Sequence, residues 1–447
     1  MNELFFLKIL KFLPQKKCDF IFYEGFKRYF KNTSWMFLGQ LLNSSISFLI
    51  GILIARYLGP LHFGELNLII SFVGIFGFLA NLGSDSILYR ELVNNPKNKN
   101  QLLGSGFFIM ILGGFFAMIL SSISGLFFFN DFDERILVFI YSLTFLLQSS
   151  SVISIFFQSK VKSSIIVITQ LLTIIISSLL KIYFIMAGLD FRWFIYSYLI
   201  EAIILFILRF FSYKLSGFNI IKWTYDLGLV KKIIKDSWPI MFSALSISIY
   251  MKIDQLMIGK MLDVSSVGIY SVAVRLSEIW YLIPSIVCIS FFPAILNAKK
   301  NNEAIYNKRL RWLYFFLFWS SFLLAVIINF SASILVNIFY GPAYIEAAFL
   351  LKIHIWSGIG VFLGYAVHKY LVAENHGDVL FFSSFIGVIV NLFFNFLLIP
   401  VVGLVGAAIA TMIAYWISTF SIIFFKKTRK EFFNLIQGIL IFFNGYE

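Results

Sequence analysis

The sequence has little charge and very little cysteine. Asp, Glu, Lys and Arg make up 13% of its 447 residues, against roughly 25% in soluble globular proteins. A chain with about half of the usual charge cannot cover a water-exposed surface of this size, which excludes a soluble protein. Cys18 and Cys288 are the only cysteines, which excludes a disulfide-stabilised scaffold.

Several catalytic motifs are also absent. The pattern G-x-x-x-x-G-K-[ST] does not occur, which excludes ATP hydrolysis by a P-loop. The four histidines show no metal-ligand spacing such as H-E-x-x-H, and no G-x-S-x-G or Cys/His nucleophile arrangement is present. We therefore expect a protein that is not an enzyme, with no metal site and no cofactor other than a coupling ion, H⁺ or Na⁺.

Apolar residues dominate what is present. They make up 60% of the chain, and the mean hydropathy is +0.89. A membrane-spanning helix needs about 20 mostly apolar residues, and the pattern predicts about twelve such helices. The expected spans are 35–57, 64–87, 103–127, 135–158, 163–187, 192–211, 237–259, 267–296, 312–338, 350–372, 379–399 and 401–425. The predicted fold class is thus all-α integral membrane.

The charges are distributed unevenly between the loops. The net charge is +14, which in a soluble protein would suggest nucleic acid, but here the charges lie between apolar blocks. If both termini and every second loop are cytoplasmic, 28 of the 36 Lys and Arg residues fall on the cytoplasmic side. This is the positive-inside pattern. It predicts cytoplasmic N- and C-termini and contacts with anionic membrane lipids, not with nucleic acid.

The two halves of the chain contain similar segments. Residues 54–64 end the first expected span and residues 258–268 end the seventh, and Ile, a basic residue, Leu and Gly recur between them at an offset of 204. This indicates a parallel repeat with a substrate site between the halves; the alternative is chance similarity between short glycine-bearing turns. The expected divisions are a cytoplasmic amphipathic segment (1–31), an N-lobe (32–211), a basic cytoplasmic linker (212–236), a C-lobe (237–425) and an interfacial tail (426–447).

Six ionisable residues lie well inside the expected spans. They are Lys181, Glu201, Lys252, Asp254, Arg275 and Glu278. Such residues are costly in a membrane, so they usually face the protein interior and have a function. Lys252, Arg275 and Lys181 would attract a phosphate-bearing group. Asp254, Glu278 and Glu201 could bind a coupling cation or proton. The alternative is that Arg275 with Glu278, which are spaced i,i+3, and Lys252 with a carboxylate form ion pairs that hold helices together.

Several segments of the chain are distinctive in their order and spacing. In the first half these are Asn32 to Gln40, Ala55-Arg-Tyr-Leu-Gly-Pro60 and Asn81 to Leu92; in the second they are Ser237-Trp-Pro239, Ile253-Asp-Gln255, Arg275-Leu-Ser-Glu278-Ile-Trp280 and Gly403-Leu-Val-Gly406. Over about residues 32–425, these segments resemble one known family, the bacterial polysaccharide flippases of the multidrug/oligosaccharidyl-lipid/polysaccharide superfamily.

The resemblance implies two six-helix lobes of the multidrug-and-toxin-extrusion type around a central cavity. In such proteins the first, second, seventh and eighth spans line the cavity, and cationic residues there receive a lipid pyrophosphate. This adds Arg56, in the Ala-Arg-x-Leu-Gly segment, to the candidate substrate-binding residues, and it supports Arg275 and Asp254.

The expected function is therefore a flippase in the bacterial inner membrane. Its substrate would be a polyprenyl-pyrophosphate-linked oligosaccharide for O-antigen (lipopolysaccharide) or capsule synthesis, and a polysaccharide polymerase and a chain-length regulator would be partners in the same membrane. One alternative is a cation-coupled multidrug exporter of the same superfamily, whose cavity should be dominated by acidic residues. Another is a membrane glycosyl polymerase, which should have a large outside loop.

Overall fold

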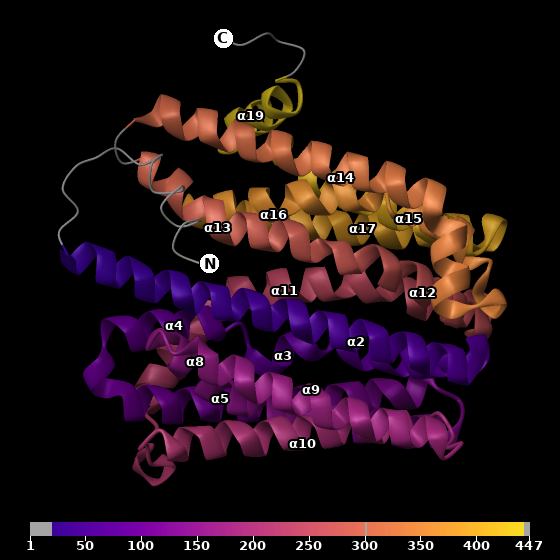
Figure 1. Ribbon diagram of the computed structural model, residues 1–447, viewed down its shortest axis with the longest axis horizontal. Coiled ribbons are helices and arrows are strands. Elements are labelled where there is room, and N and C mark those ends of the chain that lie inside the picture. Colours follow the sequence, from indigo (N-terminus) through magenta and orange to yellow (C-terminus); the bar gives the residue numbers. More distant parts are fainter. Residues whose placement is uncertain (1–19, 300–301, 442–447) are drawn as a thin grey trace, which may run out of the picture.

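The computed structural model describes residues 20–299 and 302–441, and all regular structure in this part of the chain is helical (Figure 1). Among the described residues, nine helices are long and apolar enough to cross a membrane, and the bent pair Ala347–His354 and Ser357–Ala373 makes a tenth candidate. One of the nine, α2, contains the first expected span and the start of the second, which continues through α3 into α4. Helix α11, with Lys252 and Asp254 inside it, supplies the remaining crossing. The all-α, twelve-span fold class is thus confirmed.

The first lobe, which we call the N-lobe, is drawn in indigo and magenta in Figure 1. Its helices are α2 (Phe20–Ile75), α3 (Gly77–Asn81), α4 (Asp85–Asn94), η1 (Pro96–Asn98), α5 (Lys99–Phe128), α6 (Phe132–Ser142), α7 (Thr144–Leu147), η2 (Gln148–Ser150), α8 (Ser151–Ser159), α9 (Ser163–Met186) and α10 (Arg192–Leu215).

The second lobe, the C-lobe, is drawn in orange and yellow. It contains most of α11 (Leu227–Met261), which follows η3 (Ile220–Lys222). Its other helices are α12 (Val264–Glu278), η4 (Ile279–Tyr281), α13 (Leu282–Lys299), α14 (Glu303–Tyr340), η5 (Pro342–Tyr344), α15 (Ala347–His354), α16 (Ser357–Ala373), α17 (Gly377–Val402), α18 (Leu404–Phe420), η6 (Ser421–Phe424) and α19 (Arg429–Ile439).

Helix α2 reverses direction at Gly59. This residue has φ 70°, a left-handed value that glycine adopts without steric cost, and Pro60 follows it. After the reversal the chain runs back along α11, so that Ser71 donates a hydrogen bond to Gln255 and Arg90 lies 3.5 Å from Asp236.

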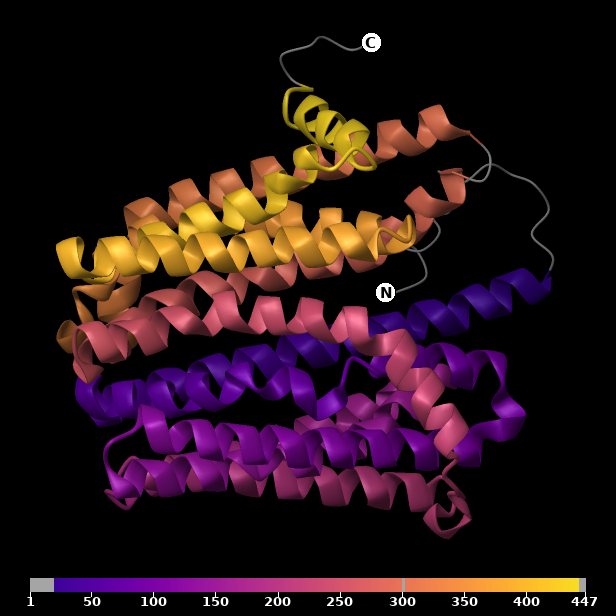
Figure 2. The same ribbon diagram turned by 180° about the vertical axis from the view of Figure 1, so that it is seen from behind.

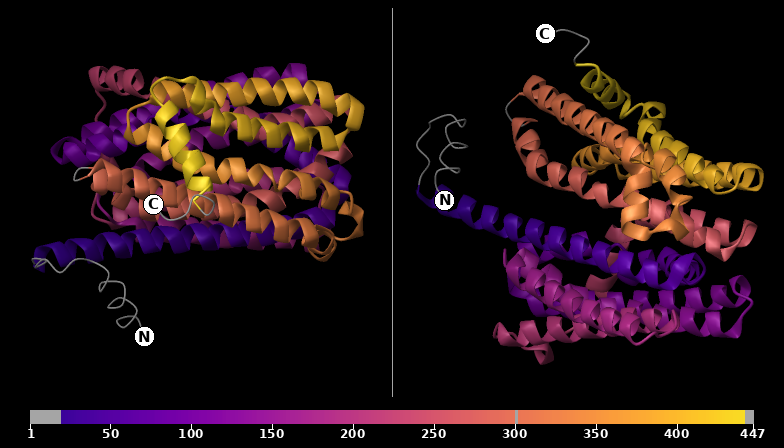
Figure 3. Two further views of the ribbon diagram at one scale, coloured as in Figure 1. Left: turned by 90° about the horizontal axis from the view of Figure 1, so that it is seen from above. Right: turned by 45° about the vertical axis from the view of Figure 1, so that its right-hand side comes forward.

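The bundle has two different ends. We call the end with the turns at Gly59, Asp263, Gly341 and Gly403 the tip end, and the end with the lysine- and arginine-rich loops the basic end. The two lobes touch at the tip end and diverge toward the basic end, where α2 separates from α13 and α14 (Figure 3).

Helix α11 connects the lobes physically. Its first turns pack in the N-lobe, where Val230 and Ile233 belong to the same hydrophobic core as Leu88 and Leu102. The rest packs along α17 in the C-lobe, and Figure 2 shows the helix bending between the two. Pro239 lies inside it and leaves one helical hydrogen bond unmade, which favours a bend there.

Capping residues fix where several helices begin. Asp226, Asp263 and Asn302 accept backbone N–H bonds at the first turns of α11, α12 and α14. Residues 212–236, the expected linker, form the end of α10, η3 and the first turns of α11. Of the expected terminal segments, residues 1–19 and 442–447 lie outside the described part of the chain.

Candidate functional site

A cavity of about 440 Å³ with both polar and apolar side chains in its wall lies between the lobes. Helix α2 supplies Gln40, Ser44 and Ser47, and the facing end of α12 supplies Arg275 and Glu278. The wall is completed by Phe48, Ile279, Tyr281, Leu282, Ser285 and Tyr365. Two of the predicted site residues, Arg275 and Glu278, therefore line one cavity at the lobe interface.

Arg275 reaches across the interface toward α2. A Cβ atom placed on Gly51 would lie 1.9 Å from its Nη1 atom, so glycine at this position makes room for the guanidinium group. The guanidinium carbon lies 5.6 Å from the ring centre of Phe63, close enough for a cation–π interaction.

Arg275 and Glu278, whose i,i+3 spacing allows an ion pair, are not in direct contact. Neither residue, nor Lys252, forms an ion pair within 4.0 Å with any described residue, although Lys252 and Arg275 both attract the Glu278 carboxylate electrostatically. Arg275 and Glu278 line the cavity without neutralising each other in a close pair, so their charges are available to a ligand there; Lys252 is not among the lining residues and acts on the site through its charge.

Asp254 lies outside this cavity, inside the C-lobe, where it is only 4% exposed. Tyr270 donates a hydrogen bond of 2.9 Å to its Oδ2 atom, and Asn395 donates one of 2.6 Å to Oδ1. Thr411 donates a further bond to Oδ2. No cationic side chain lies within 4.0 Å of this carboxylate among the described residues. A buried carboxylate held only by neutral donors is a site where a cation or a proton can bind.

The neighbours of Asp254 add further oxygen atoms. Asn395 also bonds to Asn391, at 3.1 Å, and its buried Oδ1 atom has no hydrogen-bond partner. The Thr411 hydroxyl also bonds to the Ala407 carbonyl, at 3.0 Å. Hard cations prefer oxygen ligands, so these side chains suit a small cation. The described residues contain no group of three or more His, Cys, Asp or Glu that could hold a metal.

Lys181 and Glu201 lie elsewhere, inside the N-lobe. Their Nζ and Oε2 atoms are 2.7 Å apart, and Ser177 donates a bond of 2.6 Å to the same oxygen. The Lys181 ammonium also lies 4.3 Å from the ring centre of Tyr198. This ion pair joins α9 to α10, away from the interlobe cavity.

Arg56 lies at the tip end and is not among the residues that line the interlobe cavity. It donates a bond of 2.7 Å to the carbonyl oxygen of Ile338, on α14. Nearby, Tyr344 donates a bond of 2.8 Å to the carbonyl oxygen of Ala55. Both bonds join the N-lobe to the C-lobe and help to close the tip end.

The tip end is also closed by two backbone contacts related by the offset of 204. A Cβ atom on Gly64 would lie 1.9 Å from the Val264 carbonyl oxygen, and one on Gly268 would lie 2.0 Å from that of Pro60. Adding 204 to Pro60 and Gly64 gives Val264 and Gly268, so the two contacts occupy equivalent positions in the two halves of the chain.

A second pair of contacts obeys the same relation. Gly51 packs against Arg275, and Ser71 bonds to Gln255. Adding 204 to Gly51 and Ser71 gives Gln255 and Arg275, so the two contacts occupy corresponding positions in the two halves. Four contacts at corresponding positions support the repeat over chance similarity of turns, with the two halves facing each other across the cavity.

Sequence reasoning missed the partners of Asp254. Asn391, Asn395 and Thr411 are 137 to 157 positions away in the chain, so nothing local links them to α11. One signal was present, because the two amides of Asn391 and Asn395, spaced i,i+4 in an apolar stretch of α17, share a helix face.

Comparison with known structures identifies the fold. A multidrug resistance transporter of the MATE family, in an inward-facing conformation, superimposes with a TM-score of 0.73 at 14% identity, covering 88% of this chain and 96% of that one. The lipid II flippase MurJ, in an inward closed conformation, gives 0.60 at 19% identity, covering 92% and 93%. The fold is therefore that of the two-lobed transporters and flippases of the MOP superfamily.

Comparison of the sequence identifies the family to which the chain belongs. Residues 29–299, more than half of the chain, match the model of a family described as "Polysaccharide biosynthesis protein". The chain belongs to this family. An uncharacterized membrane protein of Methanocaldococcus jannaschii, MJ1068, is 29% identical over 123 residues, which are 27% of this chain and 24% of that protein. The chain thus matches about a quarter of the length of this curated relative.

Proposed function

We propose that the protein is a flippase that moves polyprenyl-pyrophosphate-linked oligosaccharide units across the bacterial inner membrane for O-antigen or capsule synthesis. The basic end would face the cytoplasm, following the positive-inside pattern. The cavity between lobes that are closed at the tip end would then be in position to accept the substrate from the cytoplasmic leaflet. Family membership and the flippase and transporter fold support this proposal.

The observation that carries the proposal is the position of Arg275. It lies in the interlobe cavity with no carboxylate within 4.0 Å among the described residues. An arginine can bind phosphate through two parallel hydrogen bonds, and Lys252 adds a second positive charge nearby. The pyrophosphate would bind here and its oligosaccharide would occupy the cavity, while the polyprenyl chain stays in lipid.

A protein is needed because a pyrophosphate with sugars cannot cross hydrocarbon unaided. Burying a charged or hydroxyl-rich group without partners costs several kcal/mol or more per group. A cavity lined in part by Gln40, Ser44, Ser47 and Arg275 replaces the lost water with hydrogen-bond partners. Alternating access would require the tip contacts at Gly64 and Gly268 to open while the basic end closes.

Coupling to an ion gradient is proposed at Asp254. Binding of Na⁺ or H⁺ to this buried carboxylate would neutralise a charge inside α11. That helix also packs in the N-lobe and contacts α2 and α12 at the interface, so a change at Asp254 can alter how the lobes meet. Arg56 would act at the tip contact, and the Lys181–Glu201 pair would hold α9 to α10.

A second candidate, a cation-coupled multidrug exporter, is favoured by one observation. The structural similarity to a MATE transporter has the higher TM-score of the two comparisons. The cavity argues against a cationic drug because Arg275 lines it and Lys252 lies near Glu278.

The test uses a strain that lacks the gene. We expect loss of surface polysaccharide, accumulation of lipid-linked oligosaccharide in the cytoplasmic leaflet and unchanged drug susceptibility. The wild-type gene should restore the polysaccharide, and Arg275→Ala, inserted in the membrane in equal amount, should not. Intact polysaccharide together with raised drug sensitivity would favour the exporter instead.

A further inference from the structure

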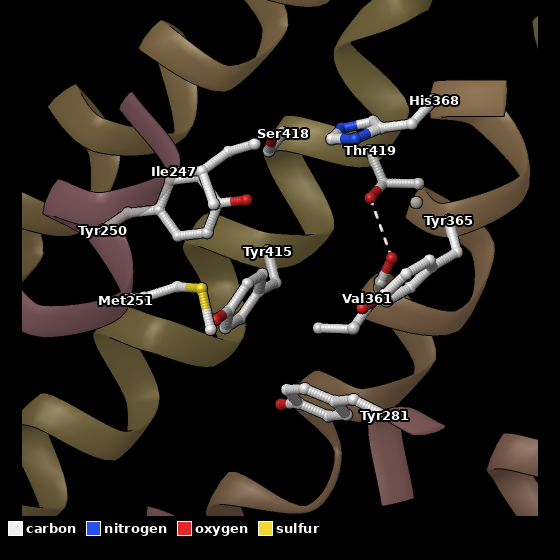
Figure 4. Close-up of a pocket in the computed structure, with 12 residues that line it drawn as sticks. Ile247, Tyr250, Met251, Tyr281, Val361, Tyr365, His368, Tyr415, Ser418 and Thr419 are labelled. Atoms are coloured by element: carbon white, nitrogen blue, oxygen red, sulfur yellow. Dashed lines mark hydrogen bonds between the residues drawn. The ribbon is translucent and has the colours of Figure 1, made fainter. Parts of the chain in front are cut away.

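A second cavity, of about 240 Å³, lies inside the C-lobe between α11, α16 and α18 (Figure 4). Four tyrosines from four different elements line it: Tyr250, Tyr281, Tyr365 and Tyr415. We call this cavity the tyrosine annex. Its remaining walls are Ile247, Met251, Gly360, Val361, Gly364, His368, Ser418 and Thr419.

The annex adjoins the interlobe cavity. Tyr281 and Tyr365 line both cavities, so the annex lies directly beside the space in which a molecule held near Arg275 would bind. Binding pockets for small molecules usually measure about 300–1,000 Å³. The interlobe cavity falls in this range, and the annex adds space that a pyrophosphate group alone does not need.

The annex presents rings and hydroxyl groups but no charged side chain. No Asp, Glu, Lys or Arg lines it, and His368 stands at one edge. The rings of Tyr250 and Tyr415 meet edge to face with their centres 5.2 Å apart, and the hydroxyls of both have no hydrogen-bond partner among the described residues. Aromatic faces with free hydroxyls at their edges match sugar rings, which have apolar C–H faces and hydroxyl edges.

The shape of the annex is set by close helix packing. A Cβ atom on Gly360 would lie 2.9 Å from the backbone carbon of Tyr415, and one on Gly364 would lie 3.0 Å from the Thr419 Oγ1 atom. Thr419 also donates a bond of 2.9 Å to the Gly360 carbonyl oxygen (Figure 4). These contacts hold α16 against α18, and a preformed pocket binds with less loss of entropy.

We infer that the tyrosine annex binds sugar residues of the lipid-linked substrate while Arg275 holds its pyrophosphate. This inference rests on the proposed function and assigns the recognition of the sugar to a set of residues distinct from those that recognise phosphate. The absence of charge in the annex indicates neutral sugars at the bound positions. Side chains lining the annex would then decide which glycans are accepted.

The test compares the binding of two ligands to the purified protein. One is polyprenyl pyrophosphate alone, and the other is the lipid-linked saccharide extracted from the strain that lacks the gene. We expect the wild type to bind the saccharide-bearing lipid at least about tenfold more tightly, as expected for a pocket that hydrogen-bonds hydroxyl groups. Val361→Phe, which fills the annex, should abolish this preference without weakening the binding of polyprenyl pyrophosphate.

Two further variants make the test decisive. Val372→Phe places the same ring on α16 at a position that is 62% exposed, and it should keep the preference. Tyr415→Phe keeps the ring but removes a hydroxyl, so it should reduce the preference even if Val361→Phe fails to fold. A preference that survives in both annex variants would overturn the inference. Failure of the wild type to bind either lipid would overturn the proposed function, and with it the inference that the annex binds sugar.

Discussion

Gly64→Ala should open the tip end of the protein. The added Cβ atom would lie 1.9 Å from the Val264 carbonyl oxygen, whereas C···O contacts normally measure about 3.3–3.6 Å. The helices must therefore separate by roughly 1.5 Å, and such overpacking typically costs about 1–3 kcal/mol. The cost applies only while the tip is closed, so the ratio of closed to open molecules should fall about 5- to 150-fold.

The assay is a distance measurement by double electron–electron resonance. Spin labels at Leu61 and Ile345, each 50% exposed and on different lobes, would be placed in a background with Cys18→Ser and Cys288→Ser. The tip-closed form should give one short distance, and Gly64→Ala should move population to a longer one.

A matched control comes from the same helix. A Cβ atom added to Gly74 would meet no other atom within 4 Å, so Gly74→Ala should leave the distances unchanged. An unaltered distance distribution in Gly64→Ala, or an equal shift in Gly74→Ala, would refute the assignment of this contact as the closed gate.

Three further predictions concern buried charges. Asp254→Asn should remove the dependence of transport and of thermal stability on Na⁺ or pH while the protein still folds, because Asn keeps the shape and one acceptor oxygen, and the hydroxyls of Tyr270 and Thr411 can turn to accept from its amide; a wild-type ion response in this variant would contradict the coupling role. Burial raises the pKa of Glu431 to about 7 from 4.5, more than the bonds from Tyr314 and Asn434 lower it. The folded state therefore holds the proton more tightly, and stability should fall by up to about 3 kcal/mol as pH rises from 4.5 through 7. Thermal unfolding should show this fall, and Glu431→Gln should abolish it; parallel pH profiles would contradict it. Lys181→Met should destabilise the N-lobe, measured by denaturation. Breaking a fully buried ion pair costs about 3–5 kcal/mol, and the loss should be smaller here because Glu201 is 30% exposed. Adding Glu201→Gln to this variant should recover most of the lost stability.

Much of the fold could be predicted from the sequence because membrane spans are local features. About 20 apolar residues between polar loops identify a helix without knowledge of its neighbours, and twelve crossings were found in this way. The residues at which each span begins and ends are less predictable. The second expected span, 64–87, is divided in the structure between the end of α2, α3 and the start of α4, because the chain turns at Leu82 and Gly83.

The candidate site was only partly predictable. The i,i+3 spacing of Arg275 and Glu278 left open whether they pair, and in the structure they remain apart beside the space provided by Gly51. Whether two neighbours on a helix pair depends on what the facing helix supplies, and spacing alone carries no such information. The offset of 204, in contrast, relates real contacts at Gly64 and Gly268, because the repeat places the two halves in equivalent positions.

The tyrosine annex was not predictable from one sequence. Its tyrosines come from four elements between residues 250 and 415, and in a chain with 19% aromatic residues no single tyrosine is distinctive. Only the packing of α16 against α18 shows that they share a cavity.

The most direct experiment measures translocation in proteoliposomes that contain only this protein and a lipid-linked oligosaccharide. The sugar can be detected by its accessibility to an added lectin or glycosidase on the outer face. We expect the wild type to equilibrate the lipid between leaflets, and Arg275→Ala to leave it where it started. Equal translocation by both proteins would contradict the role of Arg275, and no translocation by the wild type under any imposed ion gradient would contradict the flippase itself.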